Sequence, residues 1–477
     1  MLGSVAAVLV VIGIGGLFYL ESRYPAKNSG ALWIAIIYML LVASRPLSVW
    51  LGLAPPASIE QALEGSPVDR ITFGILQAMA AVVLIRRWDR VRRLLQGNTP
   101  LVVFLAYCLL SLAWSEYPWV AMKRWVKLVG EVMVIMVVLT DPVPAAAIRR
   151  FLVWPSFILA PVSVLFIKYY PELGRAYEID GTMMFVGVTN NKNLLGALCL
   201  FWGLGLLWIL LDSREGARAK APTLAVLVAL GTTLWLLKLS NSATSKSCFA
   251  IGAVLLIWAK MSVVNRTIGL LHLAPMLVSY ITFAVLVLGQ GGAILEALGR
   301  DPTLTGRTEL WERILRMADN PLLGSGYESF WLGSRLEALW NVYWWRPTQA
   351  HNGFIEIYLN LGWIGIICLV VLILAGYSDS VGQVHGRSYI AVFSYAVIVV
   401  AVIYNYTEAT FRIQNLCWIF LVWAVLALRS GAERGVQKVR LRAGRVNPWM
   451  QAWSAQPSAV GPSACVSRAG AGRGARL

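Results

Sequence analysis

The stretch Thr348-Gln-Ala-His351-Asn352-Gly353-Phe-Ile-Glu356-Ile-Tyr-Leu-Asn360-Leu-Gly362-Trp-Ile-Gly365 decides how the chain is interpreted. A polar turn that carries a histidine leads directly into an apolar segment, which continues to about residue 375. About 20 consecutive apolar residues are enough for an α-helix to cross a bilayer. The histidine is therefore expected at the point where the chain passes from water into lipid.

The composition of the whole chain indicates a membrane protein. Of its 477 residues, 58% are hydrophobic and only 14% are charged, whereas a soluble domain has roughly 45–50% apolar and about 25% charged residues. Apolar segments occur at 3–20, 31–53, 71–85, 100–114, 124–140, 151–169, 194–211, 222–239, 247–260, 270–289, 353–375, 388–406 and 415–428. Two of these are short and one begins among charges. The pattern thus predicts an all-α polytopic membrane protein with twelve to thirteen transmembrane helices.

The formal net charge of +17 does not indicate nucleic-acid binding, because the basic residues lie in short segments that flank apolar spans. Lysine and arginine are retained on the cytoplasmic side of membrane proteins. The basic clusters follow alternate ends of successive spans, and we assign that side to the cytoplasm. A transmembrane domain is predicted over 1–428. The Gly/Ala/Ser-rich basic tail 429–477 is expected to be a flexible cytoplasmic end that contacts anionic membrane lipids.

The longest segment on the opposite side is 290–352, which contains six arginines and no lysine. A connection longer than about 15 residues is usually functional or disordered, and the tryptophans and balanced charge of this loop favour order. Within it, 309–318 places Leu310 and Ile314 on one helical face and ends before Asn320-Pro321. We predict a short amphipathic helix lying on the membrane surface.

His351 is the only one of the three histidines predicted on the outer side. Histidine exchanges a proton near neutral pH, and the start of a helix attracts anions. A capping or interfacial histidine is the alternative. Arg307 begins the predicted helix of the outer loop, and its guanidinium suits a phosphate or diphosphate. An ion pair with Glu309 or Glu312 is the alternative there.

Several other basic residues lie at span ends or at membrane depth, where charged side chains are costly and usually functional. They are Arg45, Lys123, Arg124, Lys127, Lys192 and Lys246. Together they could bind an anion carried on a lipid, whereas each alone could be a snorkelling anchor. The sequence has no P-loop, dinucleotide fingerprint or His/Cys metal cluster. We therefore expect no cofactor and no metal.

Six short motifs resemble those of the O-antigen ligase and O-antigen polymerase superfamily of bacterial inner-membrane proteins, which includes exopolysaccharide polymerases. They are Trp114-Ser-Glu-Tyr-Pro118, Asn190-Asn-Lys-Asn193-Leu-Leu-Gly196, Leu239-Ser-Asn-Ser-Ala-Thr-Ser, Gly306-Arg307-Thr-Glu-Leu-Trp311, Asn320-Pro-Leu-Leu-Gly324-Ser-Gly326-Tyr, and Ala350-His351-Asn352-Gly353 with Gly362 and Gly365 downstream. The resemblance covers about residues 110–365. It is carried by the order of the motifs, and the number of spans and the large outer loop agree with it.

The resemblance implies a GT-C-like glycosyltransferase of the bacterial inner membrane whose active site faces the periplasm. It implies an undecaprenyl-diphosphate-linked glycan donor, with His351 as the base and Arg307 as a diphosphate contact. Further contacts to diphosphate or substrate are expected from Lys246, Lys192, Asn193, Arg124, Arg45 and Asn352. One departure is that Asn241 and Ser242 stand where ligases often carry an arginine, which leaves Lys246 as the nearest cation.

The acceptor would be a growing lipid-linked glycan for a polymerase or lipid A–core for a ligase, and the sequence leaves both open. Other membrane proteins of polysaccharide assembly are expected partners. Transfer would be metal-independent and would invert the anomeric carbon. The aromatic run 340–345 could stack on sugars, although tryptophans at such depth are often interfacial anchors. The alternative function is a transporter or flippase, which should carry its polar residues near mid-membrane on broken, symmetry-related helices.

Overall fold

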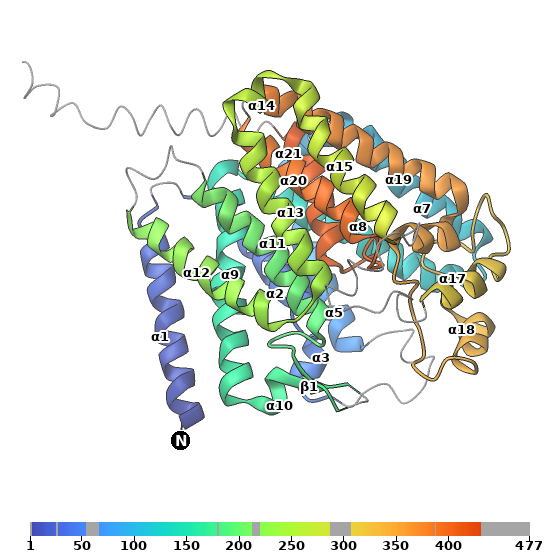
Figure 1. The fold of residues 1–477 in the computed structure, drawn as a ribbon, viewed down its shortest axis with the longest axis horizontal. Helices are drawn as coiled ribbons and strands as arrows, with labels where there is room; N and C mark the ends of the chain where they lie inside the picture. The colour runs from blue at the N-terminus through green and yellow to red at the C-terminus, as the bar shows by residue number, and fades with distance from the viewer. Residues whose placement is uncertain are drawn as a thin grey trace, which may run out of the picture. The chain divides into compact units, whose positions relative to one another are not determined.

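The computed structural model describes residues 2–24, 27–53, 66–178, 181–211, 220–286, 307–386 and 388–430. Nearly all of the predicted tail 429–477 and the first part of the predicted outer loop lie outside these residues. The elements are α1 (Leu2–Ser22), α2 (Leu32–Val42), α3 (Leu47–Trp50), α5 (Pro67–Arg86), α6 (Trp88–Gly97), α7 (Thr99–Leu110), the 3-10 helix η1 (Ser111–Trp114), α8 (Pro118–Leu139), α9 (Pro144–Tyr169), α10 (Pro171–Gly174), β1 (Arg175–Tyr177), β2 (Met183–Phe185), α11 (Lys192–Leu210), α12 (Lys220–Leu239), α13 (Ala243–Lys260), α14 (Ser262–Arg266), α15 (Ile268–Leu286), α17 (Arg307–Arg316), α18 (Gly333–Trp340), α19 (Gly353–His385), α20 (Tyr389–Tyr404) and α21 (Leu416–Arg429) (Figure 1).

The all-α fold class is confirmed, since the described strands are a single antiparallel hairpin, β1–β2. Each predicted apolar segment coincides with a helix. Among the described residues, seven helices are long and apolar enough to cross a membrane, or eight if the pair α6 and α7–η1, bent by 90°, forms one span. This count is below the predicted twelve to thirteen, because α2, α20 and α21 have only 11, 16 and 14 residues and α8 carries several charges.

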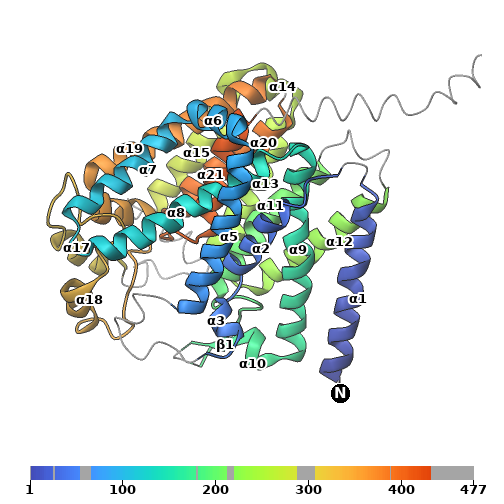
Figure 2. The ribbon, with the colours of Figure 1, turned by 180° about the vertical axis from the view of Figure 1, so that it is seen from behind.

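Helix α6 was not predicted, because its sequence is dominated by the basic cluster that follows α5. Its Val91 and Leu94 are buried, and Arg90 donates a hydrogen bond to the carbonyl oxygen of Thr140 at 2.8 Å. Figure 2 shows α6 joining α5 to α7. A basic amphipathic helix of this kind is typical of a membrane surface.

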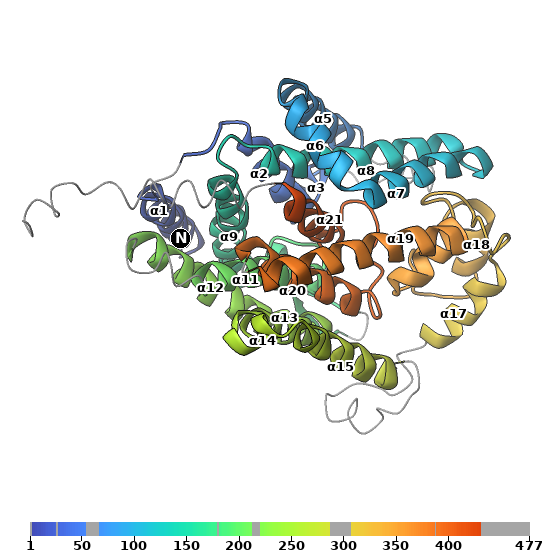
Figure 3. The ribbon, with the colours of Figure 1, turned by 90° about the horizontal axis from the view of Figure 1, so that it is seen from above.

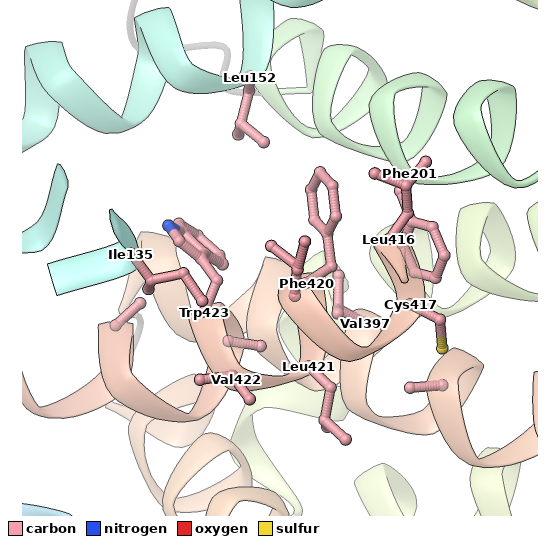
Figure 4. Packing of buried hydrophobic residues seen from close by; sticks show 14 of the residues in the cluster. Ile135, Leu152, Phe201, Val397, Leu416, Cys417, Phe420, Leu421, Val422 and Trp423 are labelled. Carbon is pink, nitrogen blue, oxygen red and sulfur yellow. The ribbon is translucent and has the colours of Figure 1, made fainter. Parts of the chain in front are cut away.

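Helices α20 and α21 form the centre of the packing. They are apolar on all sides and almost every residue in them is buried, as expected for a helix without a polar face. Helix α20 packs against α13, α19 and α21, and α21 also packs against α8 (Figure 3). Figure 4 shows Phe420 and Trp423 of α21 among Ile135, Leu152 and Phe201 of neighbouring helices. The loop that joins α20 to α21 is therefore anchored in the core at both ends.

A second, smaller core lies between α17, α18 and α19. Leu310 and Ile314 of α17 pack there with Leu339 of α18 and Leu359 of α19. Figure 1 shows α17 and α18 beside one end of α19. The predicted amphipathic helix is thus present at Arg307–Arg316, and its buried apolar side chains contact protein. The placement of this helix on a membrane surface stays a prediction.

Helix α19 is interrupted at Gly362, whose φ of +62° lies in the left-handed region. The break allows the Trp363 N–H to donate to the Pro321 carbonyl oxygen at 2.9 Å and the Ile364 N–H to donate to that of Leu322 at 3.2 Å. A Cβ atom at Gly362 would lie 2.2 Å from the Leu322 carbonyl oxygen. Glycine is therefore required here for the segment that contains Pro321 and Leu322 to dock on α19.

Candidate functional site

A cavity of about 570 Å³ lies where several helices begin. Its size falls in the range of small-molecule sites, roughly 300–1,000 Å³. The lining residues come from the β1–β2 hairpin, the start of α11, the turn before α19, the end of α20 and the loop between α20 and α21. They are Glu178, Met184, Asn191, Lys192, Asn193, Leu194, Ala197, Gln349, His351, Tyr404, Glu408, Ala409, Thr410, Arg412, Ile413, Gln414 and Asn415.

Three helices start at or beside this cavity. Asn191 caps α11 by accepting from the Leu194 N–H, and Asn415 caps α21 in the same way. Asn352, which follows His351, caps α19. The start of a helix carries partial positive charge, which suits an anion, and the carboxylates of Glu178 and Glu408 line the same cavity.

His351 occupies the turn that leads into α19, with a left-handed φ of 52°. Its Nδ1 atom lies 3.9 Å from Oε2 of Glu408 and 3.5 Å from Nε2 of Gln349, and 23% of its side chain is exposed. In the described part of the chain these polar contacts are made by Nδ1. With its proton on Nδ1, on the side of Glu408, the neutral ring would leave Nε2 able to accept a proton from a substrate.

Buried hydrogen bonds fix the backbone on both sides of His351. The Ala350 N–H donates to Oε2 of Glu356 at 2.9 Å, and the Ala350 carbonyl oxygen accepts from the indole of Trp311 at 2.6 Å. On the other side, the Gly353 N–H donates to the carbonyl oxygen of Asn405 at 2.9 Å. The histidine is thus held in position before any substrate binds, as a functional group requires.

The loop 405–415 joins the two sides of the site. Oε1 of Glu408 lies 3.4 Å from Nδ2 of Asn193, and its other oxygen faces His351. The carbonyl oxygen of Thr407 accepts a hydrogen bond from Nη1 of Arg307 at 2.6 Å. The motifs predicted around residues 190, 307 and 351, which are far apart in sequence, therefore meet at this loop.

Arg412 places a guanidinium in the cavity wall. Its Nη2 lies 3.5 Å from Oε2 of the buried Glu328, and 28% of its side chain is exposed. The Glu328 carboxylate raises the pKa of Arg412 above its ordinary value, against the opposing effect of burial. The arginine is therefore cationic at every physiological pH.

Three of the eight predicted site residues line the cavity, namely His351, Lys192 and Asn193. Lys192 forms an ion pair with Glu178, which follows β1. Arg307 and Asn352 contact the loop 405–415 from outside the lining, Asn352 through a hydrogen bond from its Nδ2 to the Tyr406 carbonyl oxygen at 3.2 Å. These five residues are brought together by the fold.

The other three predicted residues are not among the described residues that line the cavity. Arg45 donates to the carbonyl oxygens of Leu173 and Thr189 and holds the segment before α11. Lys246 is half-buried and donates to Oδ1 of Asn241 at 3.2 Å. Arg124 donates to the backbone carbonyl of Glu328, behind Arg412. In the described residues the charged groups of Arg45, Lys246 and Arg124 contact oxygens of the protein, and their role in binding substrate stays a prediction.

The sequence interpretation left Glu408 unassigned and did not single out Arg412. A signal was nevertheless present, since Arg412 lies in a short loop on the predicted outer side, where basic residues are uncommon. Nothing in the local sequence of Glu408 points to His351. Their approach depends on the packing of α19 against α20.

This fold and site define a polytopic helical membrane protein with a cavity lined by a histidine and by charged residues of both signs. Comparisons with known proteins show what the chain is similar to. A family model described as O-Antigen ligase matches residues 200–370. This range contains Lys246, Arg307 and His351 and ends before Glu408.

The chain is also similar to the exopolysaccharide production protein ExoQ of Rhizobium meliloti (strain 1021), with 27% identity over 289 residues. The alignment covers 57% of this chain and 63% of the length of that relative. The two findings confirm the resemblance to the superfamily of O-antigen ligases and polymerases, including its exopolysaccharide members.

Proposed function

We propose that this protein is a membrane glycosyltransferase that moves a glycan from an undecaprenyl-diphosphate carrier to a sugar hydroxyl of an acceptor. The observation that carries the proposal is the meeting of His351, Glu408, Lys192 and Arg412 around one cavity. The name of the exopolysaccharide relative favours a growing surface polysaccharide as the acceptor over lipid A–core. The protein is then a polysaccharide polymerase.

In the proposed reaction, Nε2 of His351 takes the proton of the acceptor hydroxyl as its oxygen attacks the anomeric carbon of the donor sugar. The bond between that carbon and the diphosphate oxygen breaks, and the polyprenyl diphosphate leaves with the electron pair. Attack opposite the leaving group inverts the anomeric centre. The Glu408 carboxylate, 3.9 Å from Nδ1, stabilises the imidazolium that forms, as a carboxylate does in other histidine-dependent sites.

The diphosphate is proposed to bind on the side of the cavity formed by the start of α11 and the loop 405–415. Lys192 and Arg412 are cations on this side, each positioned by a carboxylate, Glu178 for Lys192 and Glu328 for Arg412, and the starts of α11 and α21 add partial positive charge. Arg307, bonded to the Thr407 carbonyl, holds this loop and adds a cation nearby. Preorganised charge of this kind is usually the largest catalytic contribution, and a diphosphate leaves without a general acid.

The proposed location is the bacterial inner membrane, with the cavity facing the periplasm. Helices α11, α19 and α21 all start at the cavity side, whereas the basic cluster of α6 lies where α5 ends. Because basic residues are retained in the cytoplasm, the cavity side is assigned to the periplasm. A lipid carrier displayed in the outer leaflet could reach it there.

The function is tested with purified protein in liposomes that contain an undecaprenyl-diphosphate-linked repeat unit extracted from a strain lacking this protein. The wild type should lengthen the glycan, and the new linkage should have the opposite anomeric configuration to the donor. His351→Ala should lower the rate by about 10²- to 10⁴-fold, the usual contribution of a general base.

His272→Ala is the matched control, because His272 lies in α15 and contacts the Tyr377 hydroxyl at 2.9 Å. It should retain the rate of the wild type. Full activity of well-folded His351→Ala protein would show that His351 is not the base. If the wild type formed no polymer, the proposed function itself would be contradicted.

A further inference from the structure

We propose that Trp345, together with Gln349, forms the subsite for the acceptor sugar beside His351. This inference rests on the proposed function and adds the position of the second substrate. The ligand class is a neutral pyranose ring at the end of the acceptor glycan. The site lies on the outer-loop side of His351, across from the cations that face the diphosphate.

The indole of Trp345 lies directly against the catalytic turn. Its ring centroid is 6.2 Å from that of His351, with 43° between the planes. The ring of Tyr343, which is only 8% exposed, supports it from another direction at 5.8 Å. Trp345 nevertheless keeps 36% of its surface exposed. It is therefore a fixed ring with an open area next to the proposed base.

The segment that carries this ring is held at several points. The Arg346 N–H donates to the Tyr343 carbonyl oxygen at 3.0 Å, and the indole of Trp340 donates to the Pro347 carbonyl oxygen at 3.1 Å. The Ala350 carbonyl accepts from a third indole, as described above. A segment ordered in advance binds more tightly, because less freedom is lost when the ligand arrives.

The chemistry of this surface fits a sugar better than a phosphate. A pyranose has apolar C–H faces and polar hydroxyls at its edge, and tryptophan offers an apolar ring surface of similar size. Gln349, which lines the cavity together with His351 while Trp345 lies beside that lining, can donate to or accept from a hydroxyl. The only basic residue of 345–350 is Arg346, and its guanidinium lies over the ring of Trp340 at 5.5 Å.

A ring-sized ligand on Trp345 can touch His351 at the same time, because the two centroids are only 6.2 Å apart. One hydroxyl of the stacked sugar then reaches the imidazole, and the rest of the acceptor glycan extends away from the diphosphate. Trp345 would thus determine which hydroxyl is presented for attack.

Trp344 provides a matched control one residue away. It is 73% exposed, and no ring contact is recorded for it within the described part of the chain. An exposed tryptophan of this kind suits a membrane-interface anchor. If both tryptophans are anchors, their replacement should have the same effect.

The test compares Trp345→Ala, Trp345→Phe and Trp344→Ala in the liposome assay, with the soluble oligosaccharide released from the lipid donor by mild acid as the acceptor probe. Trp345→Ala should raise the KM for this oligosaccharide by about tenfold, from the loss of an aromatic contact, and leave the KM for the lipid donor unchanged. Trp345→Phe keeps an aromatic ring at this position. Its KM for the oligosaccharide should lie between those of the wild type and of Trp345→Ala. Trp344→Ala should match the wild type.

Equal effects of the Trp344 and Trp345 substitutions, or equal rises in the KM for donor and acceptor, would overturn the subsite. Failure of the proposed function is a different result, because the wild type would then form no polymer at all. If the Tm of Trp345→Ala protein is lower than that of the wild type, the test relies on Trp345→Phe protein instead. An unchanged KM for the acceptor in that variant contradicts the proposal.

Discussion

Glu408 contacts the two sides of the cavity with its two carboxylate oxygens. One oxygen lies 3.4 Å from the Asn193 amide and the other 3.9 Å from Nδ1 of His351. The residue is 8% exposed, so its charge is little screened by water. When His351 accepts a proton, this carboxylate faces the new positive charge. Its effect on the reaction should therefore depend on the presence of the histidine.

Replacement of Glu408 by Gln should lower kcat by on the order of tenfold to a hundredfold, because the imidazolium loses its neighbouring charge. In a His351→Ala background the same substitution should add little, since residues that act as a unit are not additive. The measurement is a double-mutant cycle on the initial rate of glycan extension. Glu337→Gln, an exposed acid of α18, is the control and should be silent. Additive losses would show that Glu408 acts independently of His351.

At the scale of elements, the site is built by contacts between α19, the outer loop and the loop 405–415. The break at Gly362 exposes two N–H groups that bind the carbonyls of Pro321 and Leu322. Above it, the first turn of α19 holds the Ala350 N–H through Glu356. The position of His351 therefore depends on the break that interrupts α19 at Gly362.

Gly362→Ala should destabilise the protein, because a Cβ would meet the Leu322 carbonyl oxygen and the left-handed φ would be strained by about 1–3 kcal/mol. Thermal unfolding in detergent should show a lower Tm, and the rate of glycan extension should fall with it. The control is Gly382→Ala in the same helix, where a Cβ would meet no atom within 4 Å. An unchanged Tm for Gly362→Ala would mean that the outer loop does not depend on this docking.

Helix positions were predictable because apolar runs are visible in a single sequence, and α19, α20 and α21 begin within a few residues of the predicted segments. His351, Lys192 and Asn193 were predictable because polar motifs at span ends are unusual. The position of Arg45 outside the cavity lining was not predictable, because a half-buried arginine that binds backbone carbonyls has the same sequence signature as one that binds a ligand. The pairing of Glu408 with His351 was not predictable, since it is created by tertiary packing alone.

At the scale of the whole molecule, the polar groups of the described chain gather on two sides. The cavity, the hairpin β1–β2 and the starts of α11, α19 and α21 lie on one side. On the other, α6 follows α5, and Arg87 pairs with Asp141 at 3.7 Å in the turn between α8 and α9. A glycosyltransferase that uses a carrier in the outer leaflet needs the first side in the periplasm.

This orientation predicts the outcome of cysteine labelling in intact cells with a membrane-impermeant maleimide. In a background without the six native cysteines, Glu337→Cys in α18 should be labelled from outside. Arg92→Cys in α6, which is also exposed, should be labelled only after the inner membrane is opened. The reverse pattern would place the cavity in the cytoplasm and exclude the proposed donor. Labelling of both positions in intact cells would indicate leaky membranes and is checked with a cytoplasmic reporter.

The loop that carries Glu408 and Arg412 lies between α20 and α21, the last two described helices. Its place in the chain determines when the cavity can be complete. During synthesis, His351 and Arg307 leave the ribosome first, and Glu408, the acid that faces the imidazole, follows after α19 and α20. A nascent chain that has inserted only as far as α19 lacks the part of the cavity lining that the loop 405–415 supplies. If the proposed function holds, turnover can therefore begin only after α20 and the loop 405–415 have joined the fold.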